Sequence, residues 1–167
     1  MTDNNLSQNE ADTLRNQMIN DNITPFIEDN FSKFPWIQAA TLFVAQYWND
    51  EAEDAVHYEV LWSQLTEPPF NRGTFPPDFN VWDPDPTNLP TGMHSSHQHG
   101  YVAQWDSNGI AIPLFAAYCK EDCHQEMDFA ECYSPLIEFT RASDGSIERK
   151  FVGSKIRPWL DGVRGQY

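Results

Sequence analysis

The sequence predicts an α+β domain, in which N-terminal helices pack on a mostly antiparallel, meander-like sheet of about six strands. Three observations support this prediction: helical spacing of apolar residues near the N-terminus, a long apolar run followed by alternating residues, and turn signals farther along the chain. A length of 167 residues suits one domain with an ordinary core. We therefore expect a flexible N-terminus over residues 1–10 and a single globular domain over residues 11–167.

The N-terminal segment has the pattern of an amphipathic helix. Apolar side chains recur at helical spacing between residues 11 and 34, which predicts one buried face. Thr24-Pro25 has the form of a helix start, because an N-cap residue is followed by proline in the first turn. We expect two helices here, or one helix that is broken at this dipeptide.

The first predicted hairpin spans residues 36–62. Residues 36–48 are β-branched and aromatic on both faces, which is typical of a central strand. A charged turn follows, and residues 55–62 then alternate between two kinds of side chain. We expect the face that carries His57 and Glu59 to be solvated.

The middle of the chain predicts a long irregular loop. Seven of the twelve prolines lie between Pro68 and Pro90, and aromatic residues are interspersed among them. Because proline is excluded from helix interiors and central strands, residues 66–96 are expected to form a proline- and aromatic-rich loop. Loops of this length are often functional, and the alternative is a strap that packs its aromatic rings onto the sheet.

Two further hairpins and a short helix complete the predicted fold. Asn108-Gly109 and Asp144-Gly145 are the turn signals. The segments that they join are residues 101–105 with 110–119, and residues 136–140 with 147–152. Residues 120–132 form a charged excursion, and residues 156–163 are expected to be a short C-terminal helix.

The charge of the chain is strongly negative and unevenly distributed. The net charge is −15, with −13 in residues 1–118, −5 in residues 119–140 and +3 in residues 141–167. Such a field repels phosphate backbones and anionic membranes, so neither nucleic acid nor a membrane is expected as a partner. It attracts a basic protein and accelerates that encounter, and it also favours solubility.

The sequence predicts a cytoplasmic location. The first 30 residues lack a basic start followed by an apolar run, and no segment approaches the roughly 18 apolar residues of a membrane span. Three cysteines are an odd number and do not form a disulfide framework. A reducing compartment, with free thiols or metal ligands, fits this composition.

Three histidines within six residues form the first candidate metal site. His97 and His99 lie two residues apart, so an extended segment places both on one face, with His94 able to fold back towards them. Three imidazoles with one open position are the ligand set of a catalytic zinc, which would support a metal-dependent hydrolase. The alternative is a solvated loop, because the spacing matches no specific zinc motif.

The cysteines form the second candidate metal site. Cys119 and Cys123 have a spacing found in structural zinc sites, Cys132 is a third candidate ligand, and a histidine such as His124 would be the fourth. Zinc is the candidate cofactor at either site, and here it would be structural. The alternative is that Cys119 is a small buried residue and the other two thiols are unpaired.

Among the function classes, a protein-binding module is favoured over an enzyme. The chain lacks phosphate-binding glycine loops and the G-x-S-x-G motif of hydrolases. It is rich in Trp and Tyr, which are frequent at interface hot spots. In overall character it is similar to bacterial immunity proteins, which neutralise a cognate toxin, although no motif carries that similarity to particular residues. The candidate partner-binding residues are acidic: Asp50, Glu51, Glu53, Asp54, Asp83 and Asp85.

Overall fold

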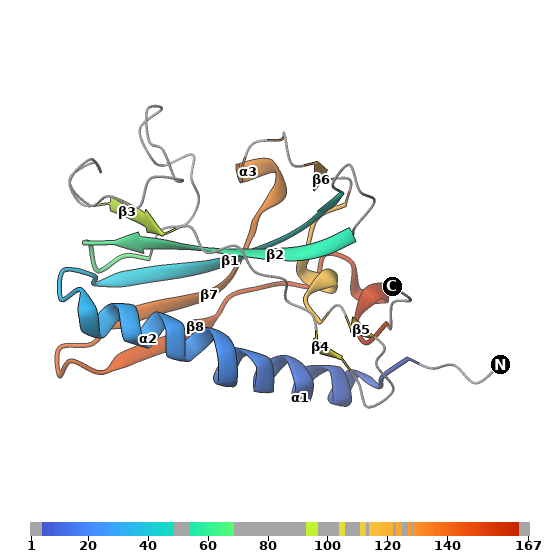
Figure 1. Cartoon of the computed structure of the whole chain (residues 1–167), viewed down its shortest axis with the longest axis horizontal. Helices are drawn as coiled ribbons and strands as arrows, with labels where there is room; N and C mark the ends of the chain where they lie inside the picture. Colours follow the sequence, from blue (N-terminus) through green and yellow to red (C-terminus); the bar gives the residue numbers. More distant parts are fainter. Residues whose placement is uncertain are drawn as a thin grey trace.

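The computed structural model confirms the predicted α+β class, with an N-terminal helical layer on a mostly antiparallel sheet (Figure 1). The structure describes residues 5–48, 54–68, 93–96, 104–105, 111–112, 114–121, 123–124, 127 and 129–163. Among these residues, no helix has the length and apolar character needed to cross a membrane.

The helical layer is one continuous helix that runs along one face of the sheet (Figure 1). It consists of α1 (Gln8–Met18), the π-helical turn η1 (Ile19–Ile23) and α2 (Thr24–Lys33). Its start is fixed by a capping box: the Ser7 hydroxyl accepts from the Glu10 amide at 3.3 Å, and the Ser7 amide donates to the Glu10 carboxylate at 2.8 Å. The helix therefore begins three residues before the apolar pattern does.

Thr24-Pro25 widens the helix and does not break it. Pro25 has no amide hydrogen to donate one turn back, and its ring crowds the carbonyl at that position. The chain responds with the π turn, in which the Thr24 amide donates to the carbonyl of Ile19, five residues earlier. The predicted interruption is thus a local change of pitch within a continuous helix.

The π turn also keeps one side of the helix against the sheet. The buried residues recur at every fourth position: Ala11, Arg15, Ile19, Ile23, Ile27 and Phe31. In a regular α-helix, each four-residue step rotates the buried position by about 40°. Five such steps would carry Phe31 to the far side, and a wider turn midway removes part of that drift.

Four long strands form the body of the sheet. They are β1 (Ala39–Trp48), β2 (Asp54–Ser63), β7 (Ser134–Arg141) and β8 (Ile147–Phe151). The order is β3-β2-β1-β7-β8, where the short strand β3 (Met93–Ser96) pairs with β2, and the two-residue β6 (Cys123–His124) pairs in parallel with β1. The expected count of about six full strands is not confirmed. The order departs from a meander, because β7 returns to the second edge of β1.

Two of the predicted hairpins have the expected partners. In the first, β1 and β2 pair from Ala39 opposite Ser63 to Trp48 opposite Asp54. In the last, β7 and β8 are joined through Gly145, whose φ of +87° is a conformation that glycine adopts without strain.

The C-terminal half contains shorter elements than expected. The described residues of the middle hairpin form β4 (Gln104–Trp105) and β5 (Ala111–Ile112), which pair antiparallel in a separate two-stranded sheet. The predicted second arm continues into a 3-10 turn, η4 (Ala116–Tyr118). The C-terminal helix is not confirmed: η5 (Pro158–Leu160) is a single 3-10 turn, closed at Gly162 with a φ of +78°.

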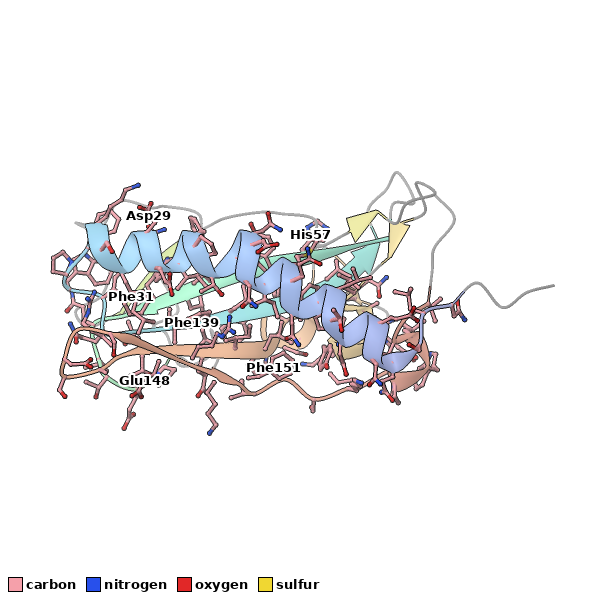
Figure 2. All side chains as sticks on the ribbon, turned by 90° about the horizontal axis from the view of Figure 1, so that it is seen from below. Asp29, Phe31, His57, Phe139, Glu148 and Phe151 are labelled. Atoms are coloured by element: carbon pink, nitrogen blue, oxygen red, sulfur yellow. The ribbon has the colours of Figure 1, made fainter. Side chains whose placement is uncertain are left out.

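The main core lies between the helix and the sheet. Phe31 of α2 and Phe139 of β7 lie in this layer (Figure 2). Trp62 of β2 receives edge-on contacts from Phe26 and Phe31, with both pairs of ring centroids 6.2 Å apart. This layer fixes the helix against the strands and leaves the outer side of the helix exposed.

Candidate functional site

Most of the acidic and histidine candidates lie outside the described residues. This holds for His97, His99, Asp50, Glu51, Glu53, Asp83 and Asp85. The backbone of His94 is described and lies in β3 opposite Trp62, and the backbone of Asp54 begins β2 opposite Trp48. The predicted histidine zinc site and the predicted acidic loop site therefore remain predictions.

The three cysteines separate into a pair and a single residue. Cys119 is part of the main core, and its thiol donates to the carbonyl oxygen of Phe115 at 3.3 Å. Cys123 and Cys132 belong to a second, smaller cluster with Ala45. Within the described ranges, no three His, Cys, Asp or Glu side chains come together as metal ligands.

The surroundings of Cys123 keep its sulfur protonated. Burial, followed by the effect of the neighbouring Cys132 side chain, raises the pKa of the Cys123 thiol to about 12. The nearby charges of Lys120 and Arg157 lower the pKa but do not offset burial. At neutral pH this sulfur is a thiol and is therefore a poor nucleophile.

The sheet face opposite the helix is buried, which corrects the expectation that β2 has a solvated face. Glu59 is 4% exposed, and Leu61, Ser63 and the neighbouring Thr41 of β1 are also buried. The sequence pattern was misleading because β2 pairs along its whole length with β1, which is apolar on both faces. A strand next to such a central strand is covered on both sides as well.

This opposite face contains polar groups with few described contacts. The hydroxyl of Thr41 is buried and makes no hydrogen bond to any described residue. Buried hydroxyls usually have a partner, because losing hydration without a new hydrogen bond costs roughly 1–3 kcal/mol. No signal in the sequence distinguished Thr41 from the apolar residues beside it.

A buried ion cluster joins the start of the helix to the C-terminal segment. Arg15 is 2% exposed, donates to the Leu114 carbonyl at 2.8 Å, and pairs with Asp161. Its guanidinium also lies 4.9 Å from the centre of the Tyr118 ring. Lys155 approaches the other carboxylate oxygen of Asp161 at 2.6 Å.

The ion cluster shifts the titration of its members. Burial alone would raise the pKa of Asp161, but the hydrogen bond from Lys155 and the charge of Arg15 outweigh it and lower that pKa. The hydrogen bond to Asp161 raises the pKa of Lys155. Both groups therefore stay charged over a wide pH range, which holds the helix start against η5.

Several other basic side chains also make internal contacts. Lys33 is an exception, because it pairs with Asp29 at 2.7 Å on the surface, where both side chains are exposed. Arg141 donates to the carbonyls of Phe31 and Ile37 at 2.7 and 2.9 Å. Arg157 donates in the same way to two carbonyls near η4, at 2.7 and 2.9 Å. Cations used in this manner contribute little to the charge that an approaching molecule meets.

The acidic side chains of the helix point outwards. Glu10, Asp21, Glu28 and Asp29 are exposed, and we call this set the acidic helix face. Figure 2 shows Asp29 on the outer side of α2, away from the core layer. These residues differ from the acidic candidates predicted from the sequence, which belong to predicted turns and loops.

An exposed tryptophan lies close to the start of this helix. Trp159 of η5 is 63% exposed. It is two residues from Asp161, whose carboxylate contacts Arg15 and Gln8 of α1. The backbone confirms this proximity, since the Leu6 amide donates to the Gly162 carbonyl at 2.8 Å. An exposed aromatic ring therefore belongs to the turn that contacts the helix start.

Comparison with family models, with curated proteins and with solved structures gives no match, so the assignment of function depends on the geometry of this chain.

Proposed function

We propose that this chain is a small acidic protein-binding module that docks a basic partner protein, of the kind that neutralises a toxin. We place it in the reducing cytoplasm, which an odd number of cysteines without a disulfide framework favours. The observation that carries the proposal is the inward use of arginines: Arg15, Arg141 and Arg157 make internal contacts while the acidic helix face is exposed.

Charge supports a basic partner. The chain has 25 acidic residues against 10 basic ones, and the internal contacts of the basic residues leave the outward field strongly negative. A field of this kind raises the association rate with a cation-rich surface, and salt suppresses the effect. The acidic residues that were predicted from the sequence, from Asp50 to Asp85, would add to the same field.

Trp159 supports a specific contact within that field. Charge alone raises the association rate and the solubility. Most of the binding free energy comes from a few side chains that are buried in the interface, and tryptophan is frequent among them. At 63% exposure, the Trp159 side chain leaves much of its apolar surface in contact with water unless a partner covers it. We assign Trp159 the role of anchor and the acidic helix face the role of electrostatic guide.

The experiment begins with partner capture. The immobilised protein is exposed to an extract of the source organism at low and high salt, with polylysine as the probe for nonspecific attraction. We expect one basic protein in stoichiometric amount that competes with polylysine. Recovery of no stoichiometric protein at either salt contradicts the proposal.

Two matched variants then separate guidance from general charge. The variant Glu10→Gln/Asp21→Asn/Glu28→Gln removes three charges from the acidic helix face, and Glu67→Gln/Glu121→Gln/Glu131→Gln removes three exposed charges that lie outside the helix. We expect the first to lower the association rate constant about tenfold or more at low salt, and the second to change it less than about threefold. Trp159→Ala is expected mainly to raise the dissociation rate. Equal effects of the two charge variants would contradict the role of the helix face.

A further inference from the structure

Two of the three cysteines are in direct proximity although neither is exposed. Cys123 and Cys132 are each 2% exposed and share one cluster. The Cys123 sulfur lies 3.7 Å from the carbonyl oxygen of Cys132, and the two side chains are within hydrogen-bonding reach of each other. All three cysteines are thiols in the structure.

We propose that Cys123 and Cys132 form a reversible disulfide, which makes this end of the sheet a redox-sensitive site. The proposal is independent of the proposed binding function, because it concerns a different part of the molecule and depends only on the contacts of this cluster. Cys119 is excluded from the pair, since it packs in the main core and donates to Phe115.

The polar groups around Cys123 favour an uncharged sulfur. Carbonyl oxygens of Lys120, Glu121, Glu131 and Cys132 lie 3.7 to 3.9 Å from it. The negative ends of four carbonyl dipoles destabilise a thiolate. A thiol can donate its one hydrogen to one of these oxygens, and a disulfide sulfur places no negative charge among them.

The same surroundings disfavour a metal at this position. Zinc and related ions require deprotonated sulfur and usually four ligands. Among the described residues no third His, Cys, Asp or Glu joins this pair. Two buried sulfurs without a third ligand fit a covalent link between them better than a tetrahedral ion.

The reaction is a thiol–disulfide exchange with a small-molecule disulfide, for which oxidised glutathione serves as the probe. The Cys132 sulfur loses its proton and attacks one glutathione sulfur, so that the glutathione S–S bond breaks and one glutathione leaves as a thiol. The Cys123 sulfur then loses its proton and attacks the Cys132 sulfur, which releases the second glutathione. Two thiols of the protein are oxidised and one glutathione disulfide is reduced to two thiols.

The disulfide would link two parts of residues 120–132, one of which pairs with the central strand β1. Cys123 lies in β6, which pairs with the end of β1, and Cys132 ends α3 (Phe129–Cys132), immediately before β7. A cross-link over this short loop removes freedom from the unfolded chain. For a chain of this size, the general scale predicts a rise of about 5–10 °C in Tm on oxidation.

The test uses the whole chain in glutathione buffers of graded redox poise. Wild type and the variants Cys119→Ala, Cys123→Ser and Cys132→Ser are equilibrated, quenched in acid, denatured and alkylated, and thiols are counted by mass spectrometry. We expect oxidised wild type to keep one thiol and Cys119→Ala to keep none, with peptide mapping that joins Cys123 to Cys132. Because counting follows denaturation, the outcome does not require every variant to be fully stable.

Two results would overturn the proposal. One is retention of three thiols in wild type at every redox poise. The other is a disulfide that includes Cys119, or a persistent mixed disulfide with glutathione in wild type. Because the thiolate is the attacking species, the rate of disulfide formation should also rise about tenfold per pH unit. A rate that does not change with pH would contradict the assigned order of steps.

Discussion

The two faces of the sheet are both buried, yet they are built from different side chains. Towards the helix, Leu42, Val60 and Trp62 form a continuous apolar layer. On the opposite face, Thr41 and Glu59 are buried among apolar side chains such as Leu61, and they bring polar atoms out of water. Equal burial therefore does not mean an equal contribution to stability. The apolar face gains free energy from dehydration and packing, whereas the polar face loses hydration that its contacts must replace.

The largest test of this contrast is at the centre of the apolar face. Phe31→Ala removes a ring that contacts Trp62 and lies 5.1 Å from the Arg141 guanidinium. We expect a loss of about 3–5 kcal/mol in the free energy of unfolding, measured by urea denaturation. The control is Phe34→Ala, which removes a ring that is 40% exposed three residues later and should cost less than about 1.5 kcal/mol. Similar losses for both variants would contradict the assignment of the core to the helix side.

The ion cluster at the start of the helix tests whether a charge can be as important as an apolar contact. Asp161→Asn leaves the buried Arg15 with its exposed neighbour Asp12 as the remaining carboxylate partner. We expect a loss of about 3 kcal/mol at neutral pH, because removing one partner strands the other charge away from water. Thermal unfolding between pH 2 and pH 11 measures both the loss and its pH dependence.

The sign of that pH dependence follows from the two pKa shifts. The lowered pKa of Asp161 provides stability that is complete above about pH 4 and is lost as the pH falls through the folded-state pKa. The raised pKa of Lys155 provides stability that is complete below about pH 10 and is lost as the pH rises through its folded-state pKa. Asp161→Asn should weaken both changes. The exposed Asp144, whose pKa is lowered by hydrogen bonds from Ser146, supplies the control Asp144→Asn. If this control weakened the alkaline change as much, Asp161 would not be the partner of Lys155.

The smallest test moves one hydroxyl between the two faces. Thr41→Val removes the buried hydroxyl that has no described partner, and we expect stability to rise by about 1 kcal/mol. Val44→Thr places a hydroxyl in the apolar layer and should lower stability by about 1–3 kcal/mol. Chemical denaturation of both variants measures the difference. A loss of stability in Thr41→Val would show that this hydroxyl has a partner.

The parts of the fold that local chemistry determines were predictable from the sequence. The helix, the hairpin of β1 and β2, and the hairpin closed by Gly145 follow from apolar spacing and turn residues. The burial of Glu59 was not predictable, because its own strand alternates like a half-solvated one. Its environment depends on strand β1 beside it, which is a tertiary effect.

The candidate site was less predictable for a similar reason. The cysteine spacing indicated a common cluster, but the chain places Cys119 in the main core and the other two in a separate cluster. Spacing cannot show which way a side chain points when the segment between two cysteines turns. Likewise, the pairing of Arg15 with Asp161 joins residues 146 positions apart, and no local pattern reports such a contact.

Strand β8 is the last strand in the order of the described sheet, and its charged residues affect whether the protein can self-associate through that edge. Glu148, Arg149 and Lys150 are consecutive and exposed along it, and Figure 2 shows Glu148 pointing away from the sheet. Arg149 is also held by Asn20 and Thr24 of the helix. An open strand edge is a template for adding further strands, and charged side chains along it make that addition costly. Three neighbouring ionic residues thus protect a terminal strand from growth into a fibril.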